Sequence, residues 1–250
     1  MTDPLFDLSG RLAVVTGGLG QLGSEYVRGL QERGMEVAVW DVDADERVDV
    51  TDRASIEAAL EQLGGVPHLL VNNAAIDTPP DAPAEEVGPF ETYPEASFDR
   101  VMDVNVKGTL LCCQVVGGAM AREGRGSIVN ISSIYGLLSP QQDVYEFRRR
   151  DGESFTKPVA YSVSKSAILN LTRYLATYWA KSGVRVNTLT LAGIFNDQPA
   201  EFLKAYTARV PLGRMAEASE AVGAIVFLAS DASSYMTGAN LVVDGGWSAW

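Results

Sequence analysis

Tyr161 and Lys165 stand four residues apart in the segment Tyr-Ser-Val-Ser-Lys. On an α-helix this spacing places two side chains on one face, one turn apart. A free tyrosine phenol has a pKa of about 10 and exchanges protons poorly near neutral pH. An ammonium group beside the phenol favours the phenolate, so we expect Lys165 to lower the pKa of Tyr161 and the pair to perform acid–base catalysis. Because such a pair also arises by chance on helix surfaces, its meaning depends on the rest of the chain.

A glycine-rich turn lies near the N-terminus, where residues 16–23 read Thr-Gly-Gly-Leu-Gly-Gln-Leu-Gly. Gly18, Gly20 and Gly23 fit the spacing G-x-G-x-x-G, between a short apolar run and a segment with helical spacing. Glycines there permit a tight turn and bring a pyrophosphate close to the backbone N–H groups at the start of a helix. The turn therefore predicts a dinucleotide site.

Asp41 ends the second apolar run, 18 residues after Gly23. A carboxylate at this place accepts hydrogen bonds from both hydroxyls of the adenosine ribose and repels a 2′-phosphate. The glycine turn contains no basic residue that would offset this repulsion. The sequence therefore predicts NAD as the cofactor, and Arg47 is the basic residue that keeps NADP as the less favoured alternative.

The elements that must position these groups alternate along the chain. Apolar runs predict strands, and helical spacing predicts helices between them. The predicted strands are 11–16, 36–41, 47–50, 68–72, 127–132, 184–191 and 240–243, and the predicted helices are 21–33, 53–63, 97–121, 159–181, 199–208 and 217–229. Strands that are apolar throughout are typical of a parallel sheet covered on both faces. With no repeat, linker or change in composition, residues 1–250 are expected to form a single α/β domain with a doubly wound parallel sheet.

Composition limits the classes of partner and compartment. A net charge of −12 and a pI near 4.5 exclude a general nucleic-acid binder. The N-terminus has no signal-peptide pattern, and no stretch approaches the roughly 18–20 apolar residues of a membrane span. Cys112 and Cys113 are expected to be buried in a reducing compartment, so we expect a cytoplasmic protein without membrane contact. His68 is the only histidine, and we expect no metal site.

Further short motifs occur in a fixed order around the pair Tyr161-x-x-x-Lys165. They are Asn72-Asn-Ala-Ala75, Asn105 in Val-Asn-Val, Ile128-Val-Asn-Ile-Ser-Ser133 and Thr237-Gly-Ala-Asn-Leu-Val-Val-Asp-Gly-Gly246. With the glycine turn, they make the chain resemble the short-chain dehydrogenase/reductase family over nearly its whole length. The resemblance implies a Rossmann fold and a nicotinamide cofactor that carries hydride while the protein supplies position and a proton.

The resemblance also implies a role for each catalytic residue. Tyr161 is the expected general acid/base, and Lys165 the residue that lowers its pKa and binds the nicotinamide ribose. Ser133 is expected to polarise the substrate oxygen, with the neighbouring Ser132 structural. Asn105 is expected to hold a water in the proton path behind Lys165.

The residues expected to contact the cofactor follow from the same motifs. They are Gly17, Leu19, Gln21, Leu22, Gly23, Asp41, Asp49, Val50, Asn73, Ala74, Ala75, Tyr161, Lys165, Ala192, Gly193, Ile194 and Asn196. The chain departs from the family pattern in several places. Gln21 replaces the middle glycine of T-G-x-x-x-G-x-G, Ala192 replaces the proline of a Pro-Gly pair, and Asn196 stands near where a threonine is usual.

Two long segments, 77–94 and 138–158, lack the spacing of regular structure. The first holds five prolines, and the second separates Ser133 from Tyr161 by 28 residues, about twice the family's usual spacing. The polarity of the second segment, here called the insertion, predicts a small hydrophilic substrate such as a sugar, polyol or hydroxy acid. The expected substrate contacts are Ser133, Tyr135, Arg148 and Arg149. The two arginines either clamp an anionic group or are solvated surface charge.

The helices predicted at 97–121 and 159–181 are apolar on more than one face. Their apolar residues are Leu110, Leu111, Val115, Val116, Ile168, Leu171, Tyr174, Leu175, Tyr178 and Trp179. An additional apolar face implies a second partner, and Trp247 and Trp250 suggest further burial at an interface. Since relatives pair these helices, we expect a homotetramer.

The leading prediction is an NAD-dependent oxidoreductase that interconverts a secondary alcohol and a ketone. Two alternatives stay open. One is an epimerase, dehydratase or dehydrogenase acting on a sugar nucleotide in surface-glycan synthesis, and the other is a nucleotide-binding regulator without catalysis.

Overall fold

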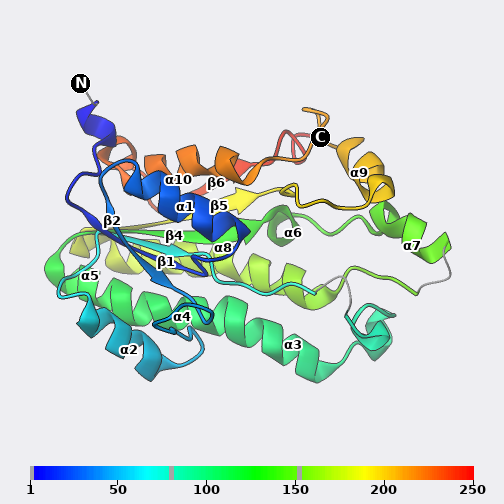
Figure 1. The fold of residues 1–250 in the computed structure, drawn as a ribbon, viewed down its shortest axis with the longest axis horizontal. Coiled ribbons are helices and arrows are strands. Elements are labelled where there is room, and N and C mark those ends of the chain that lie inside the picture. The colour runs from blue at the N-terminus through cyan, green and yellow to red at the C-terminus, as the bar shows by residue number, and fades with distance from the viewer. Residues whose placement is uncertain (1–2, 79–81, 151–153) are drawn as a thin grey trace.

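The computed structural model describes residues 3–78, 82–150 and 154–250. Its centre is one sheet of six parallel strands in the order β2-β1-β3-β4-β5-β6 (Figure 1). The strands are β1 (Leu12–Thr16), β2 (Glu36–Trp40), β3 (Leu69–Asn72), β4 (Gly126–Ser133), β5 (Val184–Leu191) and β6 (Asn240–Val243). The predicted doubly wound α/β sheet is confirmed.

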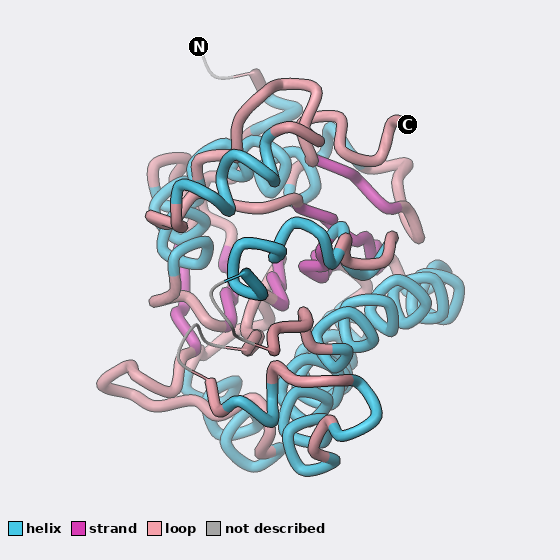
Figure 2. The backbone as a smooth tube through the Cα atoms, turned by 90° about the vertical axis from the view of Figure 1, so that its right-hand side faces the viewer, coloured by secondary structure: helices cyan, strands magenta, loops and turns pink. Residues whose placement is uncertain are grey.

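Helices cover both faces of this sheet, as the edge-on view in Figure 2 shows. One face carries α1 (Gln21–Gln31) and α10 (Val222–Ala229). The other carries α2 (Arg53–Gln62), α3 (Glu95–Met102), α4 (Thr109–Cys112), α5 (Gly118–Glu123) and α8 (Val159–Trp179). Among the shorter helices, α6 (Ile134–Leu137) directly follows β4, whereas α7 (Glu146–Arg150) and α9 (Ala200–Thr207) lie toward one end of the molecule (Figure 1).

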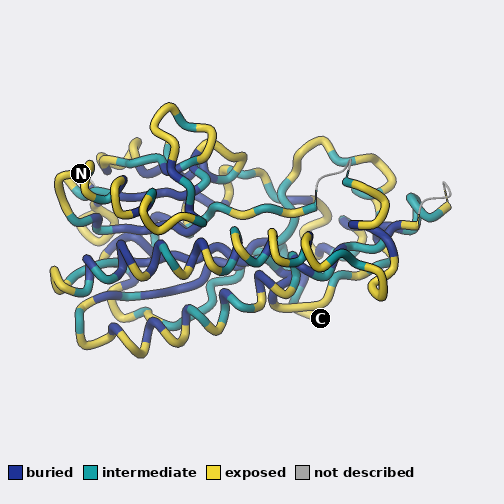
Figure 3. The backbone as a smooth tube through the Cα atoms, turned by 90° about the horizontal axis from the view of Figure 1, so that it is seen from below, coloured by how far each residue is buried: buried dark blue, intermediate teal, exposed yellow. Residues whose placement is uncertain are grey.

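The apolar strands supply both layers of the core, because successive side chains of a strand point to opposite faces. Ala13 and Val15 of β1 pack with Tyr26 and Leu30 of α1, among other residues of that layer. Val14, between them, packs in the opposite layer with residues of α2, α5 and α8. Figure 3 shows the buried backbone gathered along the strands and the inner sides of the helices.

The strand order reverses between β1 and β3, and this switch point is where ligands bind in open α/β sheets. Thr16, the last residue of β1, connects the two strand ends. Its hydroxyl accepts hydrogen bonds from the backbone N–H groups of Asn73 and Ala74, at 3.0 Å each. The glycine turn and the Asn-Asn-Ala-Ala motif therefore meet at the same edge of the sheet.

Several predicted elements differ from the observed ones. Residues 47–50 form no strand. In the described sheet β2 is an edge strand that pairs only with β1, and residues 47–50 do not add to this edge. The insertion contains a 3₁₀ turn and α7 rather than only irregular chain. The helix that runs from 95 to 123 is interrupted by two π-helical stretches, Asp103–Gly108 and Cys113–Gly117. Residues 79–81 and 151–153 of the two long segments lie outside the described residues.

Within the described part of the chain, one helical segment, Glu95–Glu123, is long and apolar enough to cross a membrane by length and composition, with a mean hydropathy of 1.2 over 18 residues. This measure does not overturn the prediction of no membrane span, because the core helix of a folded protein passes the same test. Half of that window, 50%, is buried inside the protein. Cys112, Cys113 and Val116 in this helix pack against the sheet, and a core helix needs the same apolar composition as a membrane span.

Candidate active site

A cavity of about 1290 Å³ opens at the carboxyl ends of the strands. It is larger than the roughly 300–1,000 Å³ of a pocket for one small ligand, and so has room for two. Most of the predicted site residues line it. They are Gly17, Leu19, Gln21, Leu22, Asp41, Asp49, Val50, Asn73, Ala74, Ala75, Ser133, Tyr135, Arg148, Tyr161, Lys165, Ala192, Gly193, Ile194 and Asn196. Gly23, Asn105 and Arg149 do not line the cavity.

Gly17 begins the glycine turn and needs to be glycine for two reasons. Its φ of 61° lies in the left-handed region, and a Cβ added here would come within 2.8 Å of the Cα of Ala74. Its N–H donates to the carbonyl of Trp40 at 2.7 Å, and its carbonyl accepts from Nδ2 of Asn73 at 2.9 Å. The turn is thus held between the ends of β2 and β3, close against both.

Helix α1 starts at this turn with Gly20 as its N-cap, and no side chain caps its first N–H groups. Gly23 in the first turn lets the helix pack on the glycine turn, since a Cβ would meet the carbonyl oxygen of Gly17 at 2.0 Å. A tight glycine cradle that ends in uncapped backbone donors suits a pyrophosphate. The residues present therefore fit a dinucleotide.

Gln21 occupies the place where the family pattern has a glycine. Its side-chain Nε2 donates to the carbonyl of Phe195 at 2.6 Å. This bond joins the first turn of α1 to the segment that follows β5, across the cavity mouth. Sequence spacing identified the departure but gave no sign of this contact, because Phe195 is 174 residues away.

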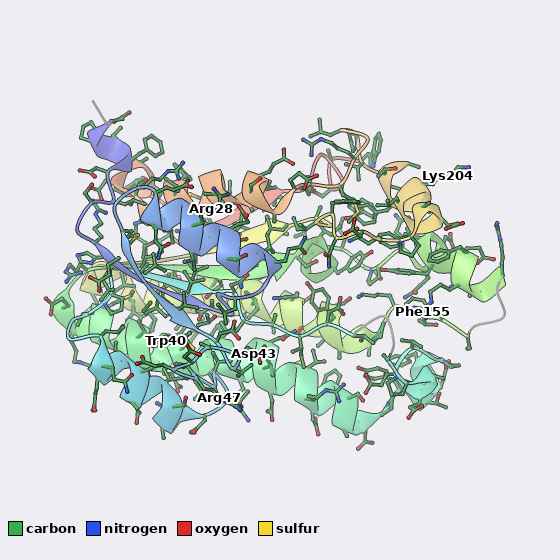
Figure 4. All side chains as sticks on the ribbon, in the orientation of Figure 1. Arg28, Trp40, Asp43, Arg47, Phe155 and Lys204 are labelled. Carbon is green, nitrogen blue, oxygen red and sulfur yellow. The ribbon has the colours of Figure 1, made fainter. Side chains whose placement is uncertain are left out.

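Asp41 faces the glycine turn from the end of β2. Its Oδ2 accepts from the N–H of Leu19 at 3.0 Å, and its Oδ1 accepts from the N–H of Asp43 at 3.1 Å. Arg47 lies nearby but pairs with Asp49 at 3.2 Å (Figure 4). The carboxylate is therefore oriented by backbone donors on the cavity wall.

Three acidic residues gather at one end of the cavity. Asp41, Asp43 and Asp49 line the end beside β2, whereas the basic lining residues among those described are Arg148, Lys157 and Lys165. Figure 4 shows Asp43 beside α2 and Phe155, the stacking partner of Arg148, farther along near α7. Hydrogen bonds from the hydroxyl and N–H of Thr51 hold the pKa of Asp49 below its usual range.

Tyr161 and Ser133 meet at the other end of the cavity. Burial raises the pKa of Tyr161, the negative charge of Asp77 raises it further, and a hydrogen bond with Ser133 lowers it. The prediction that the pKa of Tyr161 is lowered is wrong for the protein by itself. The reason is desolvation, which outweighs the favourable contacts of the phenolate.

Lys165 lies one helical turn from Tyr161, with its Nζ 5.8 Å from the centre of the tyrosine ring. The ammonium donates to the carbonyl of Ile131 at 3.0 Å. Burial lowers the pKa of Lys165 to about 8, and Asp77 acts in the opposite direction. Near neutral pH the side chain is therefore charged, buried and directed by a strand carbonyl.

Asn105 lies in the first π-helical stretch, and π-helical segments frequently occur at functional sites. Its Oδ1 accepts from the N–H of Ile76 at 2.8 Å, and its Nδ2 donates to the Ile76 carbonyl and the Ser164 hydroxyl at 2.9 and 3.0 Å. Asn105 therefore ties the segment after β3 to α8. Its contact on α8, Ser164, lies between Tyr161 and Lys165 in the sequence. The expected water-holding role stays a prediction.

An ion pair that sequence reasoning missed lies beside Tyr161. Asp77 and Lys157 join the two long segments through a bond from Nζ to Oδ2, and both line the cavity. The Nζ of Lys157 is 5.3 Å from the centre of the Tyr161 ring. A proline-rich segment and a separate charged segment offered no signal that these two residues would pair.

Arg149 is engaged within the insertion rather than at the cavity. Its guanidinium binds the Glu146 carboxylate at 2.9 Å and the carbonyls of Gln142 and Phe155 at 3.0 and 3.4 Å. The predicted contact between Arg149 and substrate is therefore wrong, because the side chain fastens the insertion to itself. Arg148 lines the cavity and lies 4.1 Å above the ring of Phe155.

Two family models match the chain. Residues 46–146 match the family described as short chain dehydrogenase, and residues 148–248 match the family described as Enoyl-(Acyl carrier protein) reductase. The cis-4-hydroxycyclohexanecarboxylate dehydrogenase of Sinomonas cyclohexanicum is 34% identical and covers 96% of this chain and 97% of its own. The galactitol 2-dehydrogenase of Rhizobium johnstonii is 34% identical and covers 98% of both chains.

Solved structures agree with these matches. A short chain dehydrogenase from Leptospira borgpetersenii with bound NAD+ has a TM-score of 0.86 and 32% identity, covering 99% of this chain and 96% of the other. A gluconate 5-dehydrogenase from Burkholderia cenocepacia, in complex with NADP and tartrate, has a TM-score of 0.82 and 26% identity, covering 99% and 98%.

Proposed function

This chain belongs to the short-chain dehydrogenase/reductase family, and from that premise we propose that it is an NAD-dependent oxidoreductase that interconverts a secondary alcohol and a ketone on a small hydroxylated substrate. The observation that carries the proposal is the meeting of Ser133, Tyr161 and Lys165 with the glycine turn and Asp41 around one cavity. A protein that only binds a dinucleotide would need the glycine turn and Asp41 but not Ser133, Tyr161 and Lys165 together. The similar dehydrogenases act on a ring alcohol and on a polyol by their names.

Residues at both ends of the cavity would hold the cofactor. Gly17 and the first turn of α1 receive the pyrophosphate, and the Asp41 carboxylate accepts from the adenosine ribose. Lys165 binds the nicotinamide ribose from α8, and Ala192, Gly193 and Ile194 line the nicotinamide side. When bound, NAD supplies the hydride acceptor of the reaction.

Tyr161 moves the proton. In alcohol oxidation its phenolate takes the hydroxyl proton, and in ketone reduction its phenol returns a proton to the oxygen. Ser133 holds that oxygen beside Tyr161 and, by its hydrogen bond, is the neighbour that lowers the pKa of Tyr161. The protonated Lys165 keeps a positive charge one helical turn away.

The preference for NAD over NADP rests on the charge around Asp41. A 2′-phosphate at this end would meet Asp41, Asp43 and Asp49, and Arg47 is already paired with Asp49. Bringing a phosphate beside three carboxylates costs free energy, whereas two ribose hydroxyls supply the donors that Asp41 accepts.

We also propose a homotetramer in the cytoplasm. Tyr174 and Tyr178 are 63% and 67% exposed and stack on the outer face of α8, with Leu110 exposed on the neighbouring helix. Cys112 and Cys113 are free and buried. Trp247 gives no support to an interface, because it is 5% exposed and packs on Tyr206 of its own chain, whereas Trp250 is 81% exposed.

The test is NADH formation by the purified protein with ring alcohols, polyols and hydroxy acids, alongside calorimetric binding of NAD. We expect turnover with at least one class and a kcat/KM about 10²- to 10⁴-fold lower with the Tyr161→Phe protein, which should still bind NAD. Binding of NAD without any turnover would contradict the proposed function and favour a sugar-nucleotide enzyme or a regulator.

A further inference from the structure

A continuous wall of aromatic rings closes the substrate end of the cavity. The rings contact one another in the order Phe155, Tyr145, Phe202, Tyr206 and Trp247, with successive centroids 4.9, 5.5, 5.5 and 4.4 Å apart. They come from the insertion, from α9 and from the chain beyond β6, which lie together at one end of the molecule (Figure 1). These five residues are called the aromatic wall below.

The wall faces the reacting residues. Tyr145, Phe155, Phe202 and Tyr206 line the same cavity as Ser133 and Tyr161, whereas Trp247 supports Tyr206 from behind. Tyr135 and Met215 add further apolar surface to the lining. A substrate whose oxygen reaches Tyr161 therefore extends its remaining atoms toward aromatic rings.

Several polar groups of this region are bound by the protein itself. The Tyr206 hydroxyl accepts from the N–H of Gly193 at 2.6 Å, and Arg149 is bound within the insertion. Lys157 pairs with Asp77. Among the charged residues of the insertion, Arg149 fastens the segment to itself, whereas Arg148 and Lys157 line the cavity. Arg148 lies over the ring of Phe155, and Lys157 is paired with Asp77, so the aromatic residues Tyr145 and Phe155 supply the apolar part of the lining.

We infer that this wall selects a substrate whose secondary alcohol lies on, or directly beside, a carbocyclic or aromatic ring, in preference to an open-chain polyol. A flat ring gains by removing apolar area from water and by stacking on the wall. An open-chain polyol would bring several hydroxyls to the faces of these rings, which offer no hydrogen-bond partner, and unpaired buried hydroxyls are costly. This inference rests on the proposed function and names the substrate class of that same site.

The experiment compares cyclohexanol and 1-phenylethanol with 2-hexanol and galactitol as substrates with NAD. A second measurement is independent of turnover: calorimetric binding of cyclohexanone and acetophenone to the protein saturated with NAD, because a ketone and the oxidised cofactor have no hydride to exchange. We expect the ring alcohols to have the higher kcat/KM and the ring ketones to bind.

Three variants test whether the wall is responsible. Tyr145→Leu removes a ring from the wall, and we expect the ratio of kcat/KM for cyclohexanol to that for 2-hexanol to fall by about threefold to tenfold. Tyr145→Phe keeps the ring and should keep the ratio. Tyr178→Leu removes an exposed ring outside the cavity and should also leave the ratio unchanged. Thermal melting checks that each variant is folded. If Tyr145→Leu is not folded, Phe202→Leu on α9 serves as the variant that removes a ring from the wall.

The outcomes separate this inference from the proposed function. Higher kcat/KM with galactitol or 2-hexanol would overturn the ring preference and leave the dehydrogenase proposal intact. Ring ketones that bind in a manner dependent on Tyr145, with no turnover of any alcohol, would support the wall and contradict the dehydrogenase. The inference would be overturned if no ring compound were either bound or turned over.

Discussion

The two ends of the cavity are built in different ways. The end beside β2 is made mainly of backbone atoms and short motifs: Gly17 touches Asn73 and Ala74, and the Asp41 carboxylate is fixed by two backbone N–H groups. The end beyond Tyr161 is made of side chains from the insertion, α9 and the C-terminal chain. In the proposed function, the first end would hold the nicotinamide cofactor, and the second end would contact the substrate.

The largest effect should come from a change that breaks the chemistry at one end and leaves the other intact. Tyr161→Phe removes the hydroxyl that exchanges the proton, and we expect kcat/KM to fall by about 10²- to 10⁴-fold. The dissociation constant of NAD, measured by calorimetry, should change little, because the glycine turn and Asp41 are untouched. Tyr178→Phe, on the same helix but exposed, is the matched control. Activity retained by Tyr161→Phe would place the proton transfer on another group.

The end beside β2 was predicted well from the sequence for a physical reason. A turn in which an added Cβ would come within 2.8 Å of the Cα of Ala74 tolerates only glycine, so residue type and spacing report the geometry directly. The strands 184–191 and 240–243 were likewise predicted with their observed bounds, since a strand covered on both faces must be apolar throughout. A strand at 47–50 failed because a short apolar run does not reveal whether a partner strand is available.

The substrate end was predicted poorly because it depends on contacts between distant residues. The polarity of the insertion is an average over its residues, and it does not show that Arg149 turns inward on the segment while Tyr145 reaches the cavity. Trp247 was assigned to an interface because nothing in the sequence places it beside Tyr206. The direction of the pKa shift of Tyr161 was missed because burial, which dominates it, is a property of the folded chain.

The next largest effect should fall on the glycine turn. Gly17→Ala adds a Cβ to a residue with a positive φ, which costs about 1–2 kcal/mol of stability. The Cβ would also lie against the Cα of Ala74, and this overpacking costs about 1–3 kcal/mol more. We expect a lower free energy of unfolding in chemical denaturation and weaker NAD binding. Gly213→Ala is the control, because Gly213 also has a positive φ, 73°, with no atom within 4 Å of the added Cβ. If the free energy of unfolding fell equally in the two proteins, the close approach of Gly17 to Ala74 would not contribute to the effect.

Cofactor selection should respond to a single charge. Asp41→Asn removes the negative charge and one acceptor for the ribose hydroxyls, and hydrogen bonds to charged groups are worth about 1.5–3 kcal/mol. We therefore expect the ratio of kcat/KM with NAD to that with NADP to fall by about 10- to 100-fold. Asp45→Asn makes the same change of charge at an exposed position of the same loop and should leave the ratio unchanged. A ratio that is equally insensitive to Asp41→Asn would remove the basis for the NAD preference.

The smallest expected effect is a shift of the pH profile of kcat/KM in Asp77→Asn. The charge of Asp77 raises the pKa of Tyr161 and that of Lys165, so removing it in Asp77→Asn should lower both. In alcohol oxidation the phenolate then forms at lower pH, and the acidic limb of the kcat/KM profile moves toward lower pH. Loss of the Lys165 charge, whose pKa is about 8, also begins earlier, so the alkaline limb moves in the same direction. The freed Lys157, 5.3 Å from the Tyr161 ring, adds to the first shift by favouring the phenolate. Asp99→Asn, exposed on α3, is the control, and an Asp77→Asn profile that coincides with it would show that the ion pair only joins the two segments.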